Sequence, residues 1–319
     1  MVIPADFPAM VGRSDYLNQL KEIADVRLYS DLPGSETEML ARLEPADVLL
    51  NSRSAVRVQA TLLEQLPKLK MIAVCGIGYD SIDLAAASQR RIIVSNIPGR
   101  TATVVAEHAF AMMLAVSRRI GDMTAEVRAA NWPADLGTSL IGKRLGVIGT
   151  GNIGRAMIRL CRAFEMEVVA WSFHPDYGLA EELGFQYVSR EDLLTASDVV
   201  SLHVRLSSDT AGLIGAEQLG MMKPGSILIN TARAAVVDTD ALADSLNTGH
   251  LFGAAVDVFD IEPVAADNPL LQCRNVVLTP HSADQTPEGL DMLTLGCVDN
   301  IRAFLDGSPQ NVVNAGLLR

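Results

Sequence analysis

Short apolar runs rich in β-branched residues alternate along the chain with segments whose apolar residues recur at helical spacing. Early in the chain, the runs at residues 47–52, 70–74 and 91–96 predict buried strands, and the segments between them predict helices. A long apolar helix is predicted from about Thr101 to Ile120. The alternation then restarts, and further strands are predicted at residues 145–149, 167–172, 198–204, 226–230, 253–259 and 275–280.

Strands that alternate with helices are typical of parallel sheets whose two faces are covered by helices. Because the pattern occurs in two sets, we predict an α/β protein with two doubly wound parallel-sheet domains. A length of 319 residues is consistent with about two domains and a well-buried core.

Composition argues against several classes of protein. Hydrophobic residues make up 49% of the chain and charged residues 20%, which indicates a globular protein. The formal charge of -12 argues against a nucleic-acid partner. No targeting leader or membrane span is apparent, the four cysteines are scattered, and no Cys/His cluster has metal-ligand spacing. We therefore expect a cytoplasmic protein with no membrane partner and no metal.

A glycine-rich pattern, G-x-G-x-x-G, follows the strand predicted at residues 145–149. Gly149 would make the tight turn, Gly151 would let the backbone approach a pyrophosphate, and Gly154 would let helix and strand pack closely. Asn152 and Ile153 then stand where backbone N–H groups at the helix N-terminus would meet phosphate. With a strand before it and a helix after it, the pattern predicts a dinucleotide site.

The acidic residue expected about 20 residues further on, which accepts hydrogen bonds from the cofactor ribose, is absent. Ser172 takes its place. The protein could have relaxed or NADP-leaning selectivity, or Ser172 could serve NAD through a neutral hydrogen bond. The sequence leaves both alternatives open, so the predicted cofactor is NAD or NADP.

Three polar residues follow later predicted strands. Arg233 follows the strand at 226–230, Glu262 the strand at 253–259, and His281 the strand at 275–280. One sheet edge could gather them, because ligands bind at the carboxyl ends of parallel strands. Reduction of a 2-oxo acid needs a cation for the carboxylate and a proton donor for the carbonyl oxygen. Arginine suits the first task, and histidine beside a carboxylate suits the second.

These motifs resemble the D-isomer-specific 2-hydroxyacid dehydrogenases, a family that includes glyoxylate and hydroxypyruvate reductases and phosphoglycerate dehydrogenases. The resemblance covers nearly the whole chain. The matching segments, in chain order, are "CGIGYDSIDLAAA", "VVAEHAFAMMLAVSRR", "GKRLGVIGTGNIGRAM", "LINTARAAVVD", "AAVDVFDIEP" and "LTPHSA".

The resemblance implies roles for individual residues. His281 would be the acid–base, paired with Glu262, and Arg233 would bind and orient the substrate. The backbone at Ile77 and Gly78 would cradle the substrate carboxylate. The residues implied to contact the cofactor are Ile77, Gly149, Gly151, Asn152, Ile153, Gly154, Ser172, Thr231, Ala232, Asp257, His281 and Ala283.

The resemblance also implies an architecture. A Rossmann NAD(P)-binding domain, residues 99–286, would be inserted in a flavodoxin-like substrate-binding domain made of residues 1–98 and 287–319. Members commonly form homodimers through the nucleotide domain, with the segment between Ile120 and Gly142 reaching across to the partner.

Several positions depart from the family pattern. Ala234 and Ala235 replace the usual Gly-Gly and could narrow the site. Arg205 replaces a usual proline and could either reach a 2′-phosphate or point into solvent. Arg53 could join the substrate pocket or be solvated, whereas His108 is interpreted as a structural residue rather than a base.

The predicted function is therefore that of an oxidoreductase, a D-2-hydroxyacid dehydrogenase that transfers hydride from NAD(P)H to a small 2-oxo acid. Glyoxylate or hydroxypyruvate is the preferred substrate, from family membership and the lack of a regulatory extension. Two alternatives stay open: a phosphoglycerate dehydrogenase-like enzyme and a nucleotide-sensing protein of the corepressor type. Formate oxidation is disfavoured, since Glu262 stands where that branch resembles a glutamine.

Overall fold

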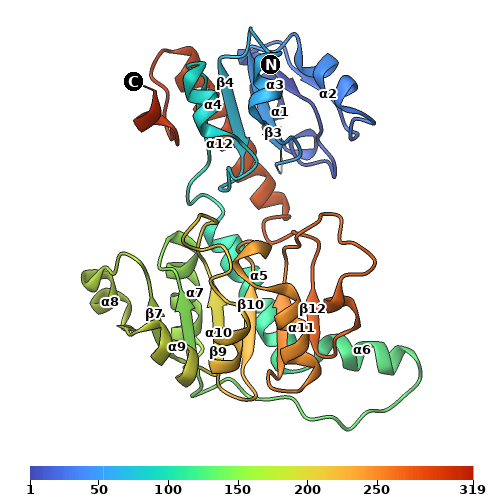
Figure 1. The fold of residues 1–319 in the computed structure, drawn as a ribbon, viewed down its shortest axis with the longest axis vertical. Coiled ribbons are helices and arrows are strands. Elements are labelled where there is room, and N and C mark those ends of the chain that lie inside the picture. The colour runs from blue at the N-terminus through green and yellow to red at the C-terminus, as the bar shows by residue number, and fades with distance from the viewer. Residues whose placement is uncertain (53, 319) are drawn as a thin grey trace. The chain divides into compact units, whose positions relative to one another are not determined.

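The computed structural model describes residues 1–52 and 54–318, which form two compact units. Unit 1 comprises Met1–Thr101 and Asp284–Arg319, and unit 2 comprises Ala102–Ala283. Each unit is built on one parallel sheet, of five strands in unit 1 and seven in unit 2 (Figure 1). The predicted fold class, α/β with two doubly wound sheets, is confirmed.

Unit 1 holds the sheet with strand order β2-β1-β3-β4-β5. Its strands are β1 Val2–Ile3, β2 Arg27–Leu28, β3 Val48–Ser52, β4 Met71–Cys75 and β5 Ile93–Ser95. Its helices are η1 Val11–Arg13, α1 Leu17–Ile23, α2 Glu36–Leu43, α3 Ala60–Glu64, α4 Leu84–Gln89, α12 Pro287–Leu305 and η4 Ala315–Leu317.

Strand β3 shows why this sheet forms. All five of its residues are buried, and successive side chains enter opposite core clusters. Leu49 packs with residues of α2, α3 and α4, whereas Val48 and Leu50 pack with residues of α1 and α12. A strand buried on both faces is typically rich in apolar residues, as Val48–Leu50 are, and the buried polar residues Asn51 and Ser52 follow at its carboxyl end.

Unit 2 holds the sheet with strand order β12-β11-β10-β9-β6-β7-β8. Its strands are β6 Arg144–Ile148, β7 Glu167–Trp171, β8 Gln186–Tyr187, β9 Val199–Leu202, β10 Ile227–Asn230, β11 Gly253–Val256 and β12 Val276–Leu278. Its helices are α5 Ala102–Ser117, α6 Ile120–Arg128, α7 Asn152–Ala163, α8 Tyr177–Leu183, α9 Arg190–Ala196, α10 Ala216–Met221, η2 Ala234–Val236, α11 Thr239–Asn247 and η3 Pro269–Gln272.

The strand order of unit 2 contains a topological switch. From β6 the chain runs outward through β7 to the edge strand β8, and it then returns to build β9 to β12 on the other side of β6. Helices α5 and α7 pack on one face of this sheet, and α9, α10 and α11 on the other. In such sheets ligands bind at the carboxyl ends of the strands beside the switch, which here lies between β6 and β9.

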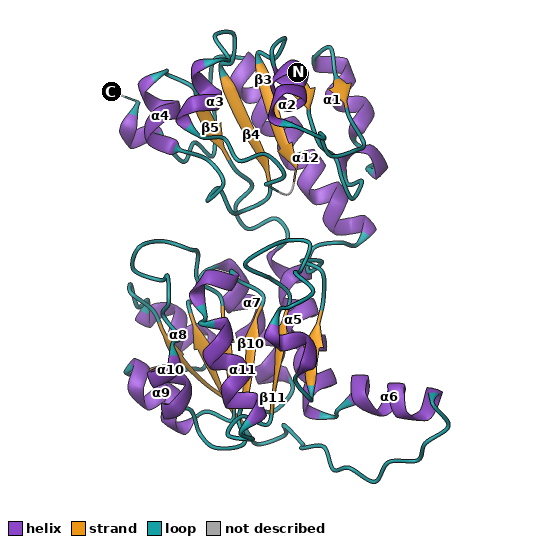
Figure 2. Ribbon diagram, turned by 45° about the vertical axis from the view of Figure 1, so that its right-hand side comes forward, coloured by secondary structure: helices purple, strands orange, loops and turns teal. Residues whose placement is uncertain are grey.

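The predicted helix from Thr101 to Ile120 is interrupted. Helix α5 ends at Ser117, and Arg119 adopts a left-handed conformation, φ 52°, before α6 begins at Ile120. No residue of α6 is buried, and α6 and the loop after it extend away from the body of unit 2 (Figure 2).

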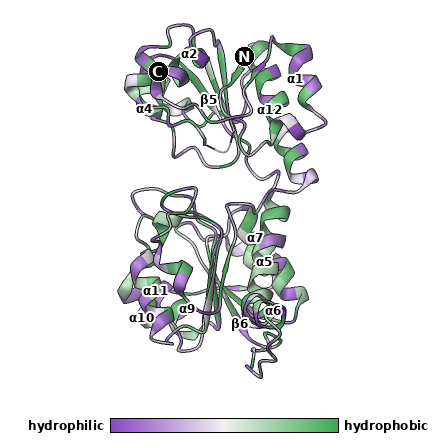
Figure 3. Ribbon diagram, turned by 90° about the vertical axis from the view of Figure 1, so that its right-hand side faces the viewer, coloured by the Kyte–Doolittle hydropathy of each residue, from purple (hydrophilic) through white to green (hydrophobic). Residues whose placement is uncertain are grey.

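Apolar residues lie along the strands and on the helix faces that cover them (Figure 3). Among the described residues, no helix has both the length and the apolar character needed to cross a bilayer.

Candidate active site

The glycine pattern forms the turn between β6 and α7. Gly149 has φ +97°, and a Cβ atom there would lie 2.6 Å from the carbonyl oxygen of His203. A Cβ atom on Gly154 would lie 2.0 Å from the carbonyl oxygen of Gly149, so the helix touches the turn. By contrast, a Cβ atom on Gly151 would meet nothing within 4 Å. Two glycines are therefore required by the fold, and the third borders open space.

The N-terminus of α7 is arranged for an anion. Its N-cap, Gly151, offers no side chain to the first-turn N–H groups, and the first turn, which begins with Asn152 and Ile153, carries no acidic residue. Uncapped N–H groups and the helix dipole favour a phosphate at such a position. These residues fit the pyrophosphate of a dinucleotide.

Ser172 follows β7 at the position of the expected acid. Its Oγ accepts a hydrogen bond from the backbone N–H of His174 at 3.3 Å. No carboxylate occurs in residues 171–175, and the next acid, Asp176, caps α8 and lies 3.7 Å from Nη2 of Arg155.

Glu262 and His281 meet beyond the carboxyl ends of the neighbouring strands β11 and β12. The distance between His281 Nδ1 and Glu262 Oε2 is 2.8 Å. The other carboxylate oxygen, Oε1, accepts the backbone N–H of Phe259 at 3.1 Å, which fixes the carboxylate. The side chains of Glu262 and His281 are 38% and 36% exposed, so the pair is accessible to a small ligand.

The backbone of His281 is strained. Its φ is +52°, a left-handed value that costs a residue with a Cβ about 1 kcal/mol or more, and its N–H donates to the carbonyl of Thr279 at 3.0 Å. Buried Asp257 holds the loop in this conformation. Its Oδ1 accepts from Thr279 Oγ1 at 2.5 Å and from Ser282 N at 2.8 Å, and its Oδ2 accepts from Ala283 N at 3.1 Å.

His108 completes this network from α5. Its Nε2 lies 3.1 Å from Thr279 Oγ1 and 3.6 Å from Asp257 Oδ1. Burial alone would raise the pKa of Asp257, but the nearby His108 imidazole and the hydrogen bonds from Thr279 and the Ser282 N–H outweigh it and hold the pKa below its ordinary value. Both oxygens of Asp257 thus serve the loop that carries His281, and the predicted cofactor contacts of Asp257 and Ala283 stay predictions.

Arg233 lies in the loop after β10. The Asn230 side chain shapes this loop, since its Nδ2 donates to the Arg233 carbonyl at 3.0 Å and its Oδ1 accepts from Ala232 N at 3.0 Å. The Arg233 guanidinium donates through Nη1 to the carbonyl of Ala232 at 2.8 Å. Strands β10, β11 and β12 are adjacent and parallel, so Arg233, Glu262 and His281 all follow the same edge of one sheet.

Thr231, in the same loop, has a buried hydroxyl with no hydrogen-bond partner among the described residues. A buried hydroxyl left unpaired is costly, and a polar ligand group could satisfy it. This observation fits the cofactor contact predicted for the segment of Thr231 and Ala232.

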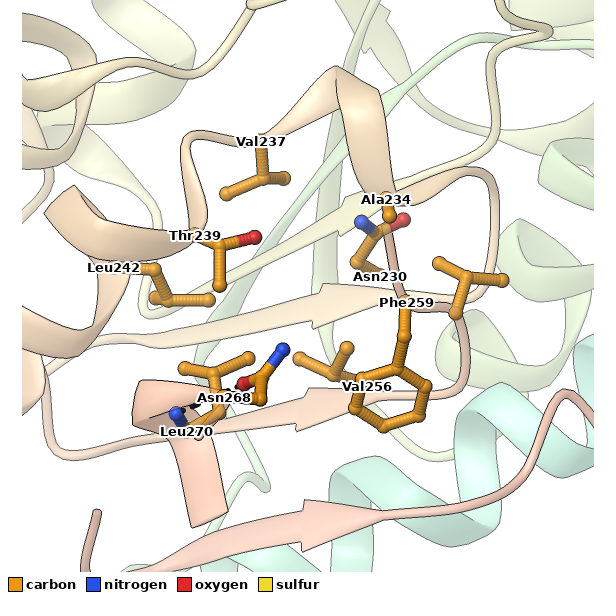
Figure 4. A pocket seen from close by; sticks show the side chains of 10 residues that line it. Asn230, Ala234, Val237, Thr239, Leu242, Val256, Phe259, Asn268 and Leu270 are labelled. Carbon is orange, nitrogen blue, oxygen red and sulfur yellow. Dashed lines mark hydrogen bonds between the residues drawn. The ribbon is translucent and has the colours of Figure 1, made fainter. Parts of the chain in front are cut away.

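A pocket is lined by residues of β10, η2, α11, β11 and η3 and of the loops beside them (Figure 4). Its lining residues are Asn230, Ala234, Val237, Thr239, Leu242, Val256, Val258, Phe259, Asn268 and Leu270. None of these ten side chains is charged, and most are apolar. A carboxylate substrate would find no cation there, so this pocket is distinct from the predicted substrate site. Ala234 and Ala235, which replace the usual glycines, are the first two residues of η2.

Ile77 and Gly78 belong to unit 1, in the loop after β4. Asn96 Nδ2 donates to the Ile77 carbonyl at 2.7 Å, and Ile97 N donates to the Gly76 carbonyl at 2.9 Å, so the loop is well anchored. Their predicted substrate contacts stay predictions. Arg53 lies outside the described residues. Among the residues that are described, no cluster of His, Cys, Asp and Glu could hold a metal ion.

Thr279 has no site role in the predictions from sequence, although it links His108 and Asp257 to the loop of His281. The available signal was its place two residues before His281 in "LTPHSA". Its partners, His108 and Asp257, lie far from it in the chain, so only the fold reveals the network.

A glycine turn at a helix N-terminus and a His–Glu pair at the same sheet edge are features that a nucleotide-dependent oxidoreductase would use. Residues 110–283 match the family model "D-isomer specific 2-hydroxyacid dehydrogenase, NAD binding domain". The chain belongs to this family, and it is an NAD(P)-dependent D-2-hydroxyacid dehydrogenase. The predicted family, enzyme class and cofactor class are confirmed.

Curated relatives and solved structures agree. The chain is 37% identical to a glyoxylate reductase of Korarchaeum cryptofilum, covering 95% of this chain and 93% of the relative. It is 40% identical to a D-3-phosphoglycerate dehydrogenase of Mycobacterium leprae, covering 85% of this chain and 51% of the relative.

Two solved structures resemble it over nearly their whole length. One is a D-lactate dehydrogenase of Aquifex aeolicus with NAD and lactic acid, TM-score 0.85, 32% identical, covering 97% of this chain and 96% of that one. The other is an acyclic imino acid reductase with NADPH and D-Arg, TM-score 0.86, 29% identical, covering 98% of this chain and 99% of that one.

Proposed function

We propose that the protein reduces a small 2-oxo acid, either glyoxylate to glycolate, which has no stereocentre, or hydroxypyruvate to D-glycerate. The contact between His281 Nδ1 and Glu262 Oε2, 2.8 Å long, carries this proposal because it provides an oriented proton donor. Glyoxylate reductases among the relatives support the choice of a small 2-oxo acid.

In this proposal His281 is the general acid. It donates a proton to the carbonyl oxygen of the substrate, and it takes the proton back in the reverse direction. Glu262 accepts from Nδ1, which orients the ring. NAD(P)H, when bound, supplies the hydride.

Arg233 would bind the substrate carboxylate and stabilise charge on the carbonyl oxygen, because its planar guanidinium can hold two oxygens at once. The backbone N–H groups of Ile77 and Gly78 would hold the carboxylate as well. We assign the substrate-binding domain to residues 1–98 and 287–319, and the NAD(P)-binding domain to residues 99–286.

The cofactor would lie along the carboxyl edge of the unit 2 sheet. Gly149, Gly151, Gly154, Asn152 and Ile153 would hold the pyrophosphate. Further contacts would come from Ile77, Ser172, Thr231, Ala232, Asp257, His281 and Ala283.

A panel of substrates tests the proposal. NADH and NADPH oxidation should be measured with glyoxylate, hydroxypyruvate, pyruvate and phenylpyruvate, and 3-phosphoglycerate oxidation in the reverse direction. We expect the highest kcat/KM with glyoxylate or hydroxypyruvate. A preference for 3-phosphoglycerate would favour the phosphoglycerate dehydrogenase alternative, and nucleotide binding without turnover of any acid would favour the corepressor type.

We further propose that the protein acts as a homodimer in the cytoplasm. The segment between Ile120 and Gly142 leaves Trp132 90% exposed and Leu136 85% exposed, which favours burial against a second copy. All four cysteines are unpaired, as expected in a reducing compartment.

A further inference from the structure

We infer that the protein prefers NADPH to NADH, and that Arg190 together with Ser172 forms the site for the 2′-phosphate of the cofactor. The inference depends on the glycine turn binding a dinucleotide, and it is independent of which 2-oxo acid is reduced. It assigns Arg190, on α9, a role that the sequence motifs do not indicate.

The strand register places Arg190 beside Ser172. β7 and β8 pair in parallel, with Ala170 opposite Tyr187, and Val188 N continues the ladder to the Ala170 carbonyl at 3.0 Å. Ser172 and Arg190 therefore follow the ends of two strands that lie about 4.8 Å apart. Both stand at the carboxyl edge, where the glycine turn also lies.

The guanidinium of Arg190 is held over an aromatic ring. Its Cζ lies 5.7 Å from the centroid of Trp171, the last residue of β7. Phe173 supports that ring from an edge-on position, with centroids 4.7 Å apart. Arg190 makes no ion pair in the described part of the chain, so its charge is available to a ligand. A cation–π contact of this kind orients a guanidinium without neutralising it.

Two nearby acidic groups, Asp176 and Asp192, have hydrogen-bond partners of their own. Asp176 accepts the N–H of Leu179 and lies 3.7 Å from Arg155, which offsets its charge. Asp192 accepts from Ser189 Oγ at 2.7 Å. In an NAD-specific site an acidic residue at this position would repel a 2′-phosphate. Here the position is occupied by Ser172, which carries no charge.

The chemistry of the two side chains matches a phosphate monoester. Arg190 can donate two parallel N–H bonds to phosphate oxygens. The Ser172 hydroxyl, which donates to the His174 carbonyl at 3.4 Å, can rotate to donate a third. NADH presents a 2′-hydroxyl instead, which gains only a neutral hydrogen bond. The difference favours NADPH, since hydrogen bonds between ionised partners are roughly twice as strong as neutral ones.

Calorimetric titration of the full chain with 2′,5′-ADP and with 5′-ADP isolates the 2′-phosphate. We expect 2′,5′-ADP to bind at least about ten-fold more tightly. Arg190→Leu should weaken 2′,5′-ADP binding by about ten-fold and change 5′-ADP binding by less than about two-fold. Ser172→Asp should reverse the preference by restoring a negative charge.

Arg159→Leu is the matched control, because it removes the same charge from α7 at a side chain that is 58% exposed and 4.0 Å from Glu182. It should leave both titrations unchanged. Equal binding of the two nucleotides to the unsubstituted chain would overturn the NADPH preference. A loss caused by Arg205→Leu and not by Arg190→Leu would overturn the assignment of Arg190.

These titrations use no 2-oxo acid, so they stand even if the proposed substrates fail. If Arg190→Leu does not fold, two other measurements still test the NADPH preference. They are nucleotide binding by Ser172→Asp and the ratio of kcat/KM for NADPH and NADH in the unsubstituted chain. A ratio near one, or a Ser172→Asp variant that keeps the preference, would contradict the inference.

Discussion

At the scale of single residues, two separate sets of contacts fix His281. The side chain is oriented by Glu262, whereas the backbone is held at a positive φ by Asp257 through Thr279, Ser282 and Ala283. Because one set acts on the ring and the other on the loop, substitutions should separate the chemistry of the imidazole from the geometry of its loop.

His281→Ala removes the proposed proton donor and leaves the glycine turn untouched. Turnover should fall by about two to four orders of magnitude, since general acid catalysis contributes about that much. The cofactor should still bind, as a fluorescence titration would show, because the glycine turn is intact. Turnover like that of the unsubstituted enzyme would rule out the proton-donor role.

Asp257→Asn removes the charge that organises the loop. The amide cannot accept all three hydrogen bonds, so we expect a loss of about 1–3 kcal/mol in the free energy of unfolding, together with a lower kcat. Because the native pKa of Asp257 lies below its ordinary value, the carboxylate stabilises the fold above its unfolded pKa of about 3.8, and this gain is lost as pH falls through the native pKa.

Urea unfolding of both proteins at several pH values checks this expectation. The gap in free energy between the enzyme and Asp257→Asn should be constant from pH 7 to about 5 and shrink below about 4. A gap that widens in acid would contradict the direction of the pKa shift.

His203 should make the free energy of unfolding depend on pH between about 6.5 and 4, a higher interval than the one for Asp257. Burial lowers the pKa of its imidazole to about 4 from an ordinary value of 6.5, so the native state favours the neutral ring. The unfolded chain takes up the proton first, and stability falls as pH drops from 6.5 towards 4, by up to about 3 kcal/mol. His203→Gln should lose less stability over this interval in urea unfolding. An identical acid dependence in both proteins would disprove the expectation.

At the scale of elements, the long buried strands could be predicted from sequence and the short ones could not. β3, β4, β6 and β9 are buried throughout or nearly so, and their apolar runs are unambiguous. β1, β2 and β8 have two residues each, too few to show a period. The position of Arg190 depends on β8, so the sequence could not place it beside Ser172.

Helix boundaries show a similar limit. Apolar residues continue from α5 into Ile120, yet Arg119 takes a left-handed conformation and the helix restarts. A hydrogen bond from Arg119 Nη2 to Asp122 Oδ2, 3.2 Å long, holds Arg119 in this conformation. The contact between Arg119 and Asp122 forms only once the chain has turned, so apolar periodicity could not predict the break in the helix.

The turn between β6 and α7 yields a paired test. Gly154→Ala would place a Cβ 2.0 Å from the Gly149 carbonyl, so α7 must move, and both thermal stability and nucleotide affinity should fall. Gly151→Ala meets open space in the protein, so its melting temperature should change little. The added methyl would stand where the pyrophosphate approaches, and affinity should fall by about ten-fold or more. Nucleotide affinity unaffected by Gly151→Ala would place the pyrophosphate elsewhere.

At the scale of the whole molecule, the two sheets and the Glu262–His281 contact could be predicted from sequence, because both depend on the order of consecutive parallel strands and on the residues just after them. The network of Asp257, Thr279 and His108, which joins α5 to two loops, could not be predicted. Side chains from distant elements meet there only because α5 packs across β10, β11 and β12.

The exposed apolar segment of unit 2 supports the last prediction, which concerns assembly. Trp132 and Leu136 lie beyond α6, a helix without a buried residue, and contribute no core contact in the described chain. Replacing both with serine should leave the melting temperature of the monomer unchanged and weaken self-association by about ten-fold or more, as measured by sedimentation equilibrium. Tyr177→Ser, at a side chain that is 71% exposed on α8, is the control and should not alter association. A double variant that associates as tightly as the unsubstituted chain would exclude this segment from the dimer interface.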